Sequence, residues 1–199
     1  MKSHLRNLTI PFFASGFAAL VYQVTWQRLL FVSLGVDIES ITIIVSTFML
    51  GLGIGALIGG QLADRYPSRI IKLFAAAEFT IGMFGLFSPE LIVYLGTITI
   101  GESLFVIAAC NFLLLLIPTT LMGATLPMLV AFLVRRSDNV GGSIGWLYFI
   151  NTLGASLGAL LVGFFLLFYF EINTTIYCAA VLNVLVSIGV LLLFRSEKW

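Results

Sequence analysis

The chain has 199 residues, of which 60% are hydrophobic and 10% are charged, and its formal net charge is +1. A soluble domain carries about 25% charged residues, so a chain this apolar lacks the polar surface that a water-exposed fold needs. Each membrane-spanning helix needs about 20 apolar residues. Six such helices leave room only for short loops, which excludes a soluble catalytic domain and points to the lipid bilayer rather than nucleic acid as partner.

The reactive side chains exclude several mechanisms. The single histidine, His4, lies at the extreme N-terminus, which rules out bis-histidine haem ligation, a histidine metal centre and a histidine-dependent nucleophile. All three lysines lie beside apolar segments rather than inside them, so a retinal-type Schiff base has no candidate. Cys110 and Cys178 fall within apolar runs and are typical of packing residues. We therefore expect no catalytic residue, metal or cofactor, and no enzyme.

In chain order, the apolar stretches predict one all-α, polytopic membrane domain over residues 1–199. They predict six transmembrane helices, at about 8–34, 40–63, 70–88, 103–134, 143–169 and 173–194. No clear cleavage site follows the first stretch, so we interpret it as a retained helix rather than a signal peptide. Residues 91–100 are too short to span alone, and we expect an interfacial or re-entrant segment there on the outer side.

The loop charges predict the orientation. Basic residues flank the N-terminus, the second and fourth loops and the C-terminus, whereas the other three loops carry acidic residues and no Lys or Arg. Because basic loops stay on the cytoplasmic side, both termini should face the cytoplasm. Basic loops on either side of residues 73–134 also require an even number of crossings between them.

Two prolines, Pro118 and Pro127, interrupt the long fourth stretch. A proline removes one helical hydrogen bond and kinks the helix. Inside a membrane, the freed carbonyl must be satisfied by protein or by a wet cavity. Either the kinks only fit the helix to a curved bundle, or they form a hinge or a cavity wall of the kind found in transporters.

The second stretch ends in two overlapping patterns. Gly51, Gly55 and Gly59 lie four residues apart and share a helix face that lets another helix approach closely. The following Gly-x-x-x-Asp-Arg-x-x-x-Arg run is similar to the cytoplasmic loop motif between helices two and three of the major facilitator superfamily. Its residues are Gly60, Asp64, Arg65 and Arg69.

The fifth stretch repeats the small-residue pattern with Gly154 and Gly158. Residues 55–60, Gly-Ala-Leu-Ile-Gly-Gly, closely match residues 158–163, Gly-Ala-Leu-Leu-Val-Gly, about half the chain apart. This match favours a three-plus-three internal repeat, the arrangement of many secondary transporters.

Three strings carry a closer resemblance, at residues 13–30, 118–127 and 147–155. The more specific parts are Met-Gly-Ala-Thr-Leu-Pro in the second and Asn-Thr-Leu-Gly-Ala in the third. The three strings resemble the membrane domain of bacterial fused proteins that join a facilitator-like helical region to a spermidine-synthase-like domain. The resemblance implies half of a facilitator-like bundle in a bacterial cytoplasmic membrane. No synthase domain follows Trp199 here, so aminopropyl transfer is not carried over. Gln23 stands where the family usually has Glu, so a proton-coupled role at this position is not carried over from the family.

Polar residues inside the membrane are costly and are functional candidates. Glu78 lies about 12 Å into the third helix and should be paired or protonated, either as an interhelical hydrogen bond or as a proton carrier. Arg28 lies in the outer part of the first helix, at a different depth, and we expect it to extend outward toward Asp37 or Glu39.

A further set of polar side chains is the best candidate for a cavity wall. Tyr22, Gln23 and Trp26 share one face of the first helix. Helices four and five add Asn111, Thr119, Thr120, Thr125 and Asn151. The alternative is that the Asn and Thr side chains only join helices, at about 1 kcal/mol each.

Two functions remain open. A facilitator has two six-helix halves, so the first hypothesis is a half-transporter that dimerises through the glycine faces of helices two and five. Asp64 would then lie near residues 141–143 of a second copy, and the solute would be a small metabolite such as a polyamine. The second hypothesis is a non-catalytic anchoring or structural subunit of a larger membrane complex, with a separate synthase-like protein as partner.

Overall fold

The computed structural model describes residues 2–35, 37–136 and 139–195, and within them it contains helices and no strands. The longer helices are α1 (Lys2–Leu34), α2 (Asp37–Arg65), α3 (Ile70–Ile98), α4 (Leu104–Val134), α5 (Val140–Leu161) and α7 (Ile172–Leu193). A short 3-10 turn, η1 (Pro67–Arg69), precedes α3, and a π-helical turn, η2 (Val162–Leu166), joins α5 to α6 (Leu167–Tyr169). Six spans, with α5 to α6 counted as one, are long and apolar enough to cross a membrane. The predicted all-α class and the six spans are confirmed.

The expected separate segment at residues 91–100 is wrong, because α3 continues without a break to Ile98. Pro89 lies inside this helix and has no N–H for the carbonyl of Gly85, four residues earlier. The hydroxyl of Ser88 donates to that carbonyl at 2.9 Å. Because the side chain replaces the missing donor, the helix passes the proline, and one long crossing takes the place of a span plus an outer segment.

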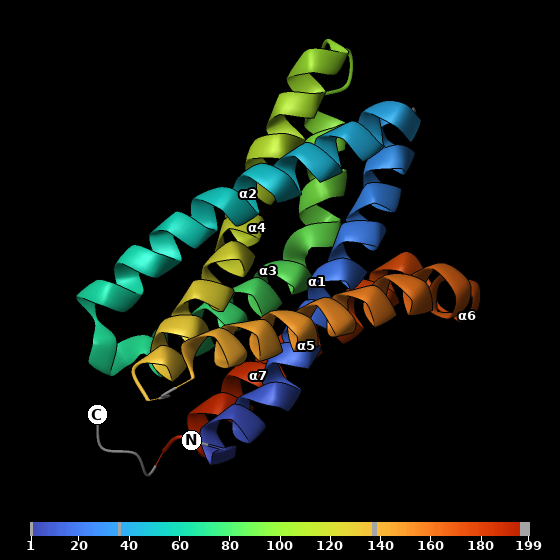
Figure 1. Ribbon diagram of the computed structural model, residues 1–199. Helices are drawn as coiled ribbons and strands as arrows, with labels where there is room; N and C mark the ends of the chain where they lie inside the picture. Colours follow the sequence, from blue (N-terminus) through green and yellow to red (C-terminus); the bar gives the residue numbers. More distant parts are fainter. Residues whose placement is uncertain (1, 36, 137–138, 196–199) are drawn as a thin grey trace.

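Two helix pairs form the frame of the bundle, α2 with α4 and α1 with α5, and the members of each pair run in the same general direction and cross obliquely (Figure 1). In the first pair, a Cβ atom on Gly55 would overlap the carbonyl oxygen of Thr120. In the second pair, a Cβ atom on Gly158 would come within 2.5 Å of the carbonyl oxygen of Phe17. The glycines therefore bring backbone against backbone within one chain.

This packing corrects the expected dimer contact. The faces that carry Gly51, Gly55 and Gly59 on α2, and Gly154 on α5, are filled by α4 and α1 of the same chain. They are not free to meet a second copy, so a two-fold contact through these glycines is excluded.

The third pair, α3 and α7, is antiparallel and has an internal symmetry. Ser187 of α7 donates a hydrogen bond to the carbonyl of Ala75 at 2.7 Å. A Cβ atom on Gly82 of α3 would lie 2.9 Å from the carbonyl oxygen of Ala180. Residues 75 and 82 are seven positions apart, and so are residues 180 and 187. Residue 75 of α3 meets residue 187 of α7, and residue 82 meets residue 180. In a three-plus-three inverted repeat, α1, α2 and α3 correspond to α4, α5 and α7. The contact of α2 with α4 then corresponds to the contact of α5 with α1, and both are observed.

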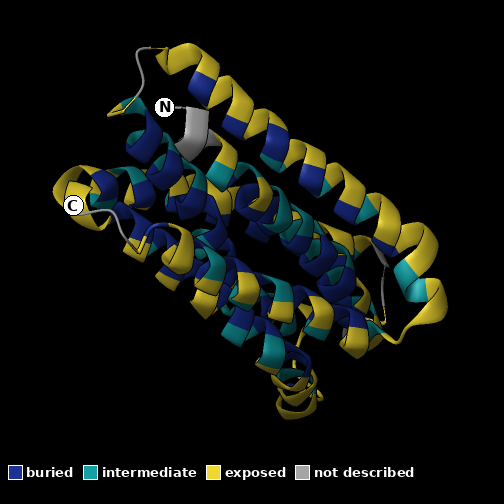
Figure 2. Cartoon of the chain, turned by 90° about the horizontal axis from the view of Figure 1, so that it is seen from below, coloured by how far each residue is buried: buried dark blue, intermediate teal, exposed yellow. Residues whose placement is uncertain are grey.

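The outer faces of the helices are apolar. On α5 the buried residues form a single stripe, which includes Leu147, Ile150 and Gly154. Large apolar side chains outside this stripe, such as Phe149 and Leu157, are exposed, and Figure 2 shows exposed residues beside the buried ones along the helices. Such a surface suits lipid rather than water, so the chain is built as an integral membrane protein.

Candidate functional site

A cavity of about 280 Å³ lies between α1, α2, α4 and α5. Its wall is mostly apolar and includes Phe48, Leu52 and Met122. Five uncharged polar side chains also line it: Ser15 and Gln23 from α1, Thr125 from α4, and Tyr148 and Asn151 from α5. Small ligand sites combine an apolar wall with a few polar groups in this way.

The α1–α5 wall of the cavity is fixed by close contacts. The side-chain amide of Asn151 donates to the carbonyl of Phe12 at 3.2 Å. A Cβ atom on Gly16 would overlap the backbone oxygen of Asn151, so the glycine allows this approach. Asn151 therefore joins two helices and lines the cavity, which combines both roles that its sequence suggested.

The α4 wall contains one of the two prolines. Pro127 lines the cavity, and so does Gly123, whose carbonyl loses its helical donor because residue 127 has no N–H. Thr125 lies between them and donates to the carbonyl of Met122 at 2.7 Å. Pro118 is buried but does not line the cavity. Of the two alternatives for the prolines, the cavity wall applies to Pro127.

The other aromatic candidates pack between α1 and α3 instead. Tyr22 and Trp26 are both fully buried, and their rings stack with centroids 4.7 Å apart. The indole Nε1 of Trp26 donates to the hydroxyl of Ser88 at 2.8 Å. The hydroxyl of Tyr22 lies against Gly85, where a side chain would collide with it. These two residues stabilise the α1–α3 contact and do not line the cavity.

Two further candidates also lie away from the cavity. Asn111 is fully buried in α4, and its amide donates to the carbonyl of Ile107 one turn earlier at 2.9 Å. Arg28 is exposed in the C-terminal half of α1. Of its two expected partners, Asp37 has a side chain outside the described residues, and Glu39 has a buried Oε2 without a hydrogen-bond partner.

Glu78 joins three helices. None of its surface is exposed. Its Oε1 accepts a hydrogen bond from Ser15 of α1 at 2.6 Å, and its Oε2 accepts one from the amide of Asn183 of α7 at 2.6 Å. The sequence prediction does not include Ser15 or Asn183. An Asn in the middle of the last apolar stretch is the signal that points to the second of them.

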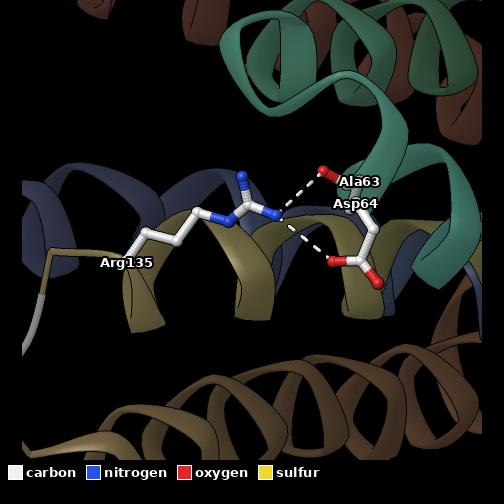
Figure 3. A network of polar contacts seen from close by, with 3 residues as sticks. All are labelled: Ala63, Asp64 and Arg135. Carbon is white, nitrogen blue, oxygen red and sulfur yellow. Dashed lines mark hydrogen bonds and ion pairs between the residues drawn. The ribbon is translucent and has the colours of Figure 1, made fainter.

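The loop motif is anchored inside the chain. Arg135, which follows α4, approaches Asp64 at 3.2 Å and also donates to the carbonyl of Ala63 at 3.3 Å (Figure 3). The guanidinium thus satisfies a carbonyl in the last turn of α2, where a cation is also favoured by the helix dipole. Arg135 was missing from the predicted motif residues.

The remaining motif residues lie near this ion pair. Arg65 and Arg69 are exposed, and Gly60 is half-buried with open space around its Cα. The N-terminus of α5, which we expected to receive Asp64 from a second copy, is capped within the chain because Asn139 accepts from the Gly142 N–H at 2.9 Å. Among the described residues, no group of His, Cys, Asp and Glu is placed to hold a metal ion.

The sequence is similar to that of a curated protein named polyamine aminopropyltransferase from Oceanobacillus iheyensis. The two are 26% identical over 200 residues, which cover 97% of this chain. The chain spans only 37% of the length of that relative. No family model matches the chain, and no solved structure matches it.

Proposed function

We propose that the chain is a facilitator-like half-transporter that moves a small polar solute across a bacterial cytoplasmic membrane as a dimer. The observation that carries this proposal is the cavity among α1, α2, α4 and α5, with its five uncharged polar side chains. Burying such groups within a bilayer is expensive, so a cluster of them around a space favours a solute site.

The opening of the cavity indicates where a second copy would lie. Leu52 and Ala56 of α2 and Tyr148 of α5 line the cavity and are also exposed, so the cavity opens between these two helices. A second six-helix unit packed over this opening would close it. The dimer contact would therefore use the exposed faces of α2 and α5, not their glycine faces.

The solute class is suggested by the name of the relative and by the cavity chemistry together. The relative is named for polyamines, and amide oxygens and aromatic faces such as those of Gln23, Asn151 and Tyr148 bind ammonium groups. The lining has no carboxylate, so it would bind a partly deprotonated polyamine or a neutral solute of similar length better than a fully charged one.

Uptake into proteoliposomes tests this function. We expect purified protein to accumulate labelled spermidine, and Ala155→Phe, which fills the cavity, to abolish uptake. The matched control is Ala76→Phe, which adds the same ring to the exposed face of α3. Equal uptake by both variants, or no uptake of spermidine or of an uncharged diol of matched length, would contradict the proposal.

A second function is favoured by one observation: the relative carries the name of an enzyme, and the chain matches 37% of it. In this alternative the helices anchor a separate aminopropyltransferase at the membrane. Purification in mild detergent separates the two proposals. A dimer of this chain alone favours transport, whereas a stoichiometric complex with a soluble transferase favours anchoring.

A further inference from the structure

Glu78 is a carboxyl group without a charged partner among its hydrogen bonds. It is fully buried, and it accepts from Ser15 and from Asn183, which are both neutral donors. An ionised carboxylate in such surroundings loses much of its hydration, and two neutral hydrogen bonds offset only part of that loss. Protonation removes the charge and with it this cost.

Among the described residues, the hydrogen-bond partners of Glu78 on the neighbouring helices are both uncharged. The segments that form α4 and α7 contain no Asp, Glu, Lys or Arg. On α3 itself, Lys72 and Glu90 are about 9 and 18 Å away along the helix axis. The charged side chains described on α1, Arg6 and Arg28, are exposed and lie about 14 and 20 Å from Ser15 along the helix axis. The other titratable groups within the spans of α1, α4 and α7 are neutral when protonated: Tyr22, Cys110, Tyr177 and Cys178. The charge of Glu78 is therefore compensated by none of these groups.

Both hydrogen-bond partners fit either protonation state. A serine hydroxyl donates to a carboxylate and accepts from a carboxylic acid. The Oδ1 atom of Asn183 is buried without a hydrogen-bond partner. If the amide of Asn183 turns over, this oxygen accepts from protonated Glu78. The site thus keeps its hydrogen bonds whether Glu78 is charged or neutral.

Ser15 connects this carboxyl group to the solute cavity, because it both donates to Glu78 and lines the cavity. We propose that Glu78 is a proton-binding site that exchanges protons with the cavity through the hydroxyl of Ser15. When Glu78 is protonated, Ser15 Oγ accepts a proton from a hydronium ion in the cavity and releases its own proton to Glu78 Oε1. Glu78 changes from an anion to a neutral acid, and the hydronium ion becomes water.

This inference rests on the proposed function and deepens it, because it names the proton as the ion that exchanges between the solute cavity and Glu78. Proton exchange at Glu78 does not itself require transport. It can therefore be measured on the purified protein without a known solute, and its failure is distinct from a failure to transport.

Infrared difference spectroscopy of the protein in lipid provides the first test. Between acidic and alkaline buffer we expect the carbonyl band of a protonated carboxylic acid to be lost, and this change to be missing in Glu78→Gln. The matched control is Glu90→Gln, since Glu90 is an exposed carboxylate of the same helix that accepts from a hydroxyl of α7, that of Tyr177, at 2.8 Å. A wild-type spectrum without a Glu78-dependent band change over the whole range in which the protein stays folded would overturn the proposal.

The route through Ser15 is tested by deuterium exchange of the same band. Transfer to deuterated buffer should shift the band quickly in the wild type and severalfold more slowly in Ser15→Ala and in the cavity-filling Ala155→Phe. Ala76→Phe, on the exposed face, should exchange at the wild-type rate. Equal exchange rates in all four proteins would overturn the route.

If the Glu78→Gln protein of the first test does not fold, Glu78→Asp serves in its place, with a shifted but still titrating band expected.

Discussion

The hydroxyl of Ser88 donates to the carbonyl of Gly85, the one acceptor in α3 that Pro89 leaves without a helical donor. The same hydroxyl accepts from the indole of Trp26 at 2.8 Å. One side chain therefore repairs the helix at the proline and attaches α1 to it.

Replacing Ser88 by Ala removes both contacts at once. Two buried polar groups, the Gly85 carbonyl and the Trp26 indole N–H, would lose a partner, and we expect the free energy of unfolding to fall by about 1 to 3 kcal/mol. Unfolding in mild detergent measures this. Thr97→Ala is the matched control, because Thr97 makes a similar bond to the carbonyl of Tyr94 but is exposed. Equal losses in both variants would show that the repair at Pro89 does not stabilise the protein.

A second prediction concerns the close contact of α2 with α4. Gly55→Ala would place a methyl group onto the Thr120 carbonyl, and moving the helices apart should cost about 1 to 3 kcal/mol of stability. A methyl group added at Gly53, two residues earlier, would meet nothing within 4 Å, so Gly53→Ala should leave stability unchanged or raise it by up to about 1 kcal/mol. The order of the two melting temperatures checks this, and the reverse order would contradict the packing.

The spans could be predicted from the sequence because a helix crosses a bilayer when its apolar stretch is long enough for the hydrocarbon core, and that length follows from composition alone. It was insufficient at residues 91–100, since a proline normally ends a helix and the repair by Ser88 depends on a side-chain rotamer. The cavity residues were predicted in part. Gln23, Thr125 and Asn151 line it, whereas Tyr22 and Trp26 point to α3, because helical spacing fixes a shared face but not the neighbour that the face meets.

The internal repeat gives a third prediction. Gly158 occupies the place in the α5–α1 contact that Gly55 occupies in the α2–α4 contact, and both meet a backbone carbonyl. Gly158→Ala should therefore destabilise the protein to a similar degree as Gly55→Ala. Gly189→Ala on α7, where nothing lies within 4 Å, is the control. If Gly158→Ala were as stable as that control, the two halves would not pack equivalently.

The ion pair between Asp64 and Arg135 should matter little for stability. The Asp64 side chain is 83% exposed, and exposed ion pairs contribute between 0 and about 1 kcal/mol. We expect Asp64→Asn to lower stability by less than about 1 kcal/mol, with a difference that vanishes in high salt. Arg135→Gln should cost more, since it also leaves the Ala63 carbonyl without this donor. Equal costs for the two variants would show that the carbonyl contact contributes nothing.

The last prediction concerns orientation, which we propose from the loop charges alone. Single cysteines would be introduced at Ser68, in the short turn before α3, and at Glu102, in the turn between α3 and α4, after both native cysteines are replaced by Ala. Both positions are exposed, and the single long helix α3 separates them. In intact bacterial cells, a membrane-impermeant maleimide should label the cysteine at 102 and not the one at 68, which should react only after the membrane is opened. Labelling of both in intact cells would mean that α3 does not cross the membrane, and the opposite pattern would reverse the proposed orientation.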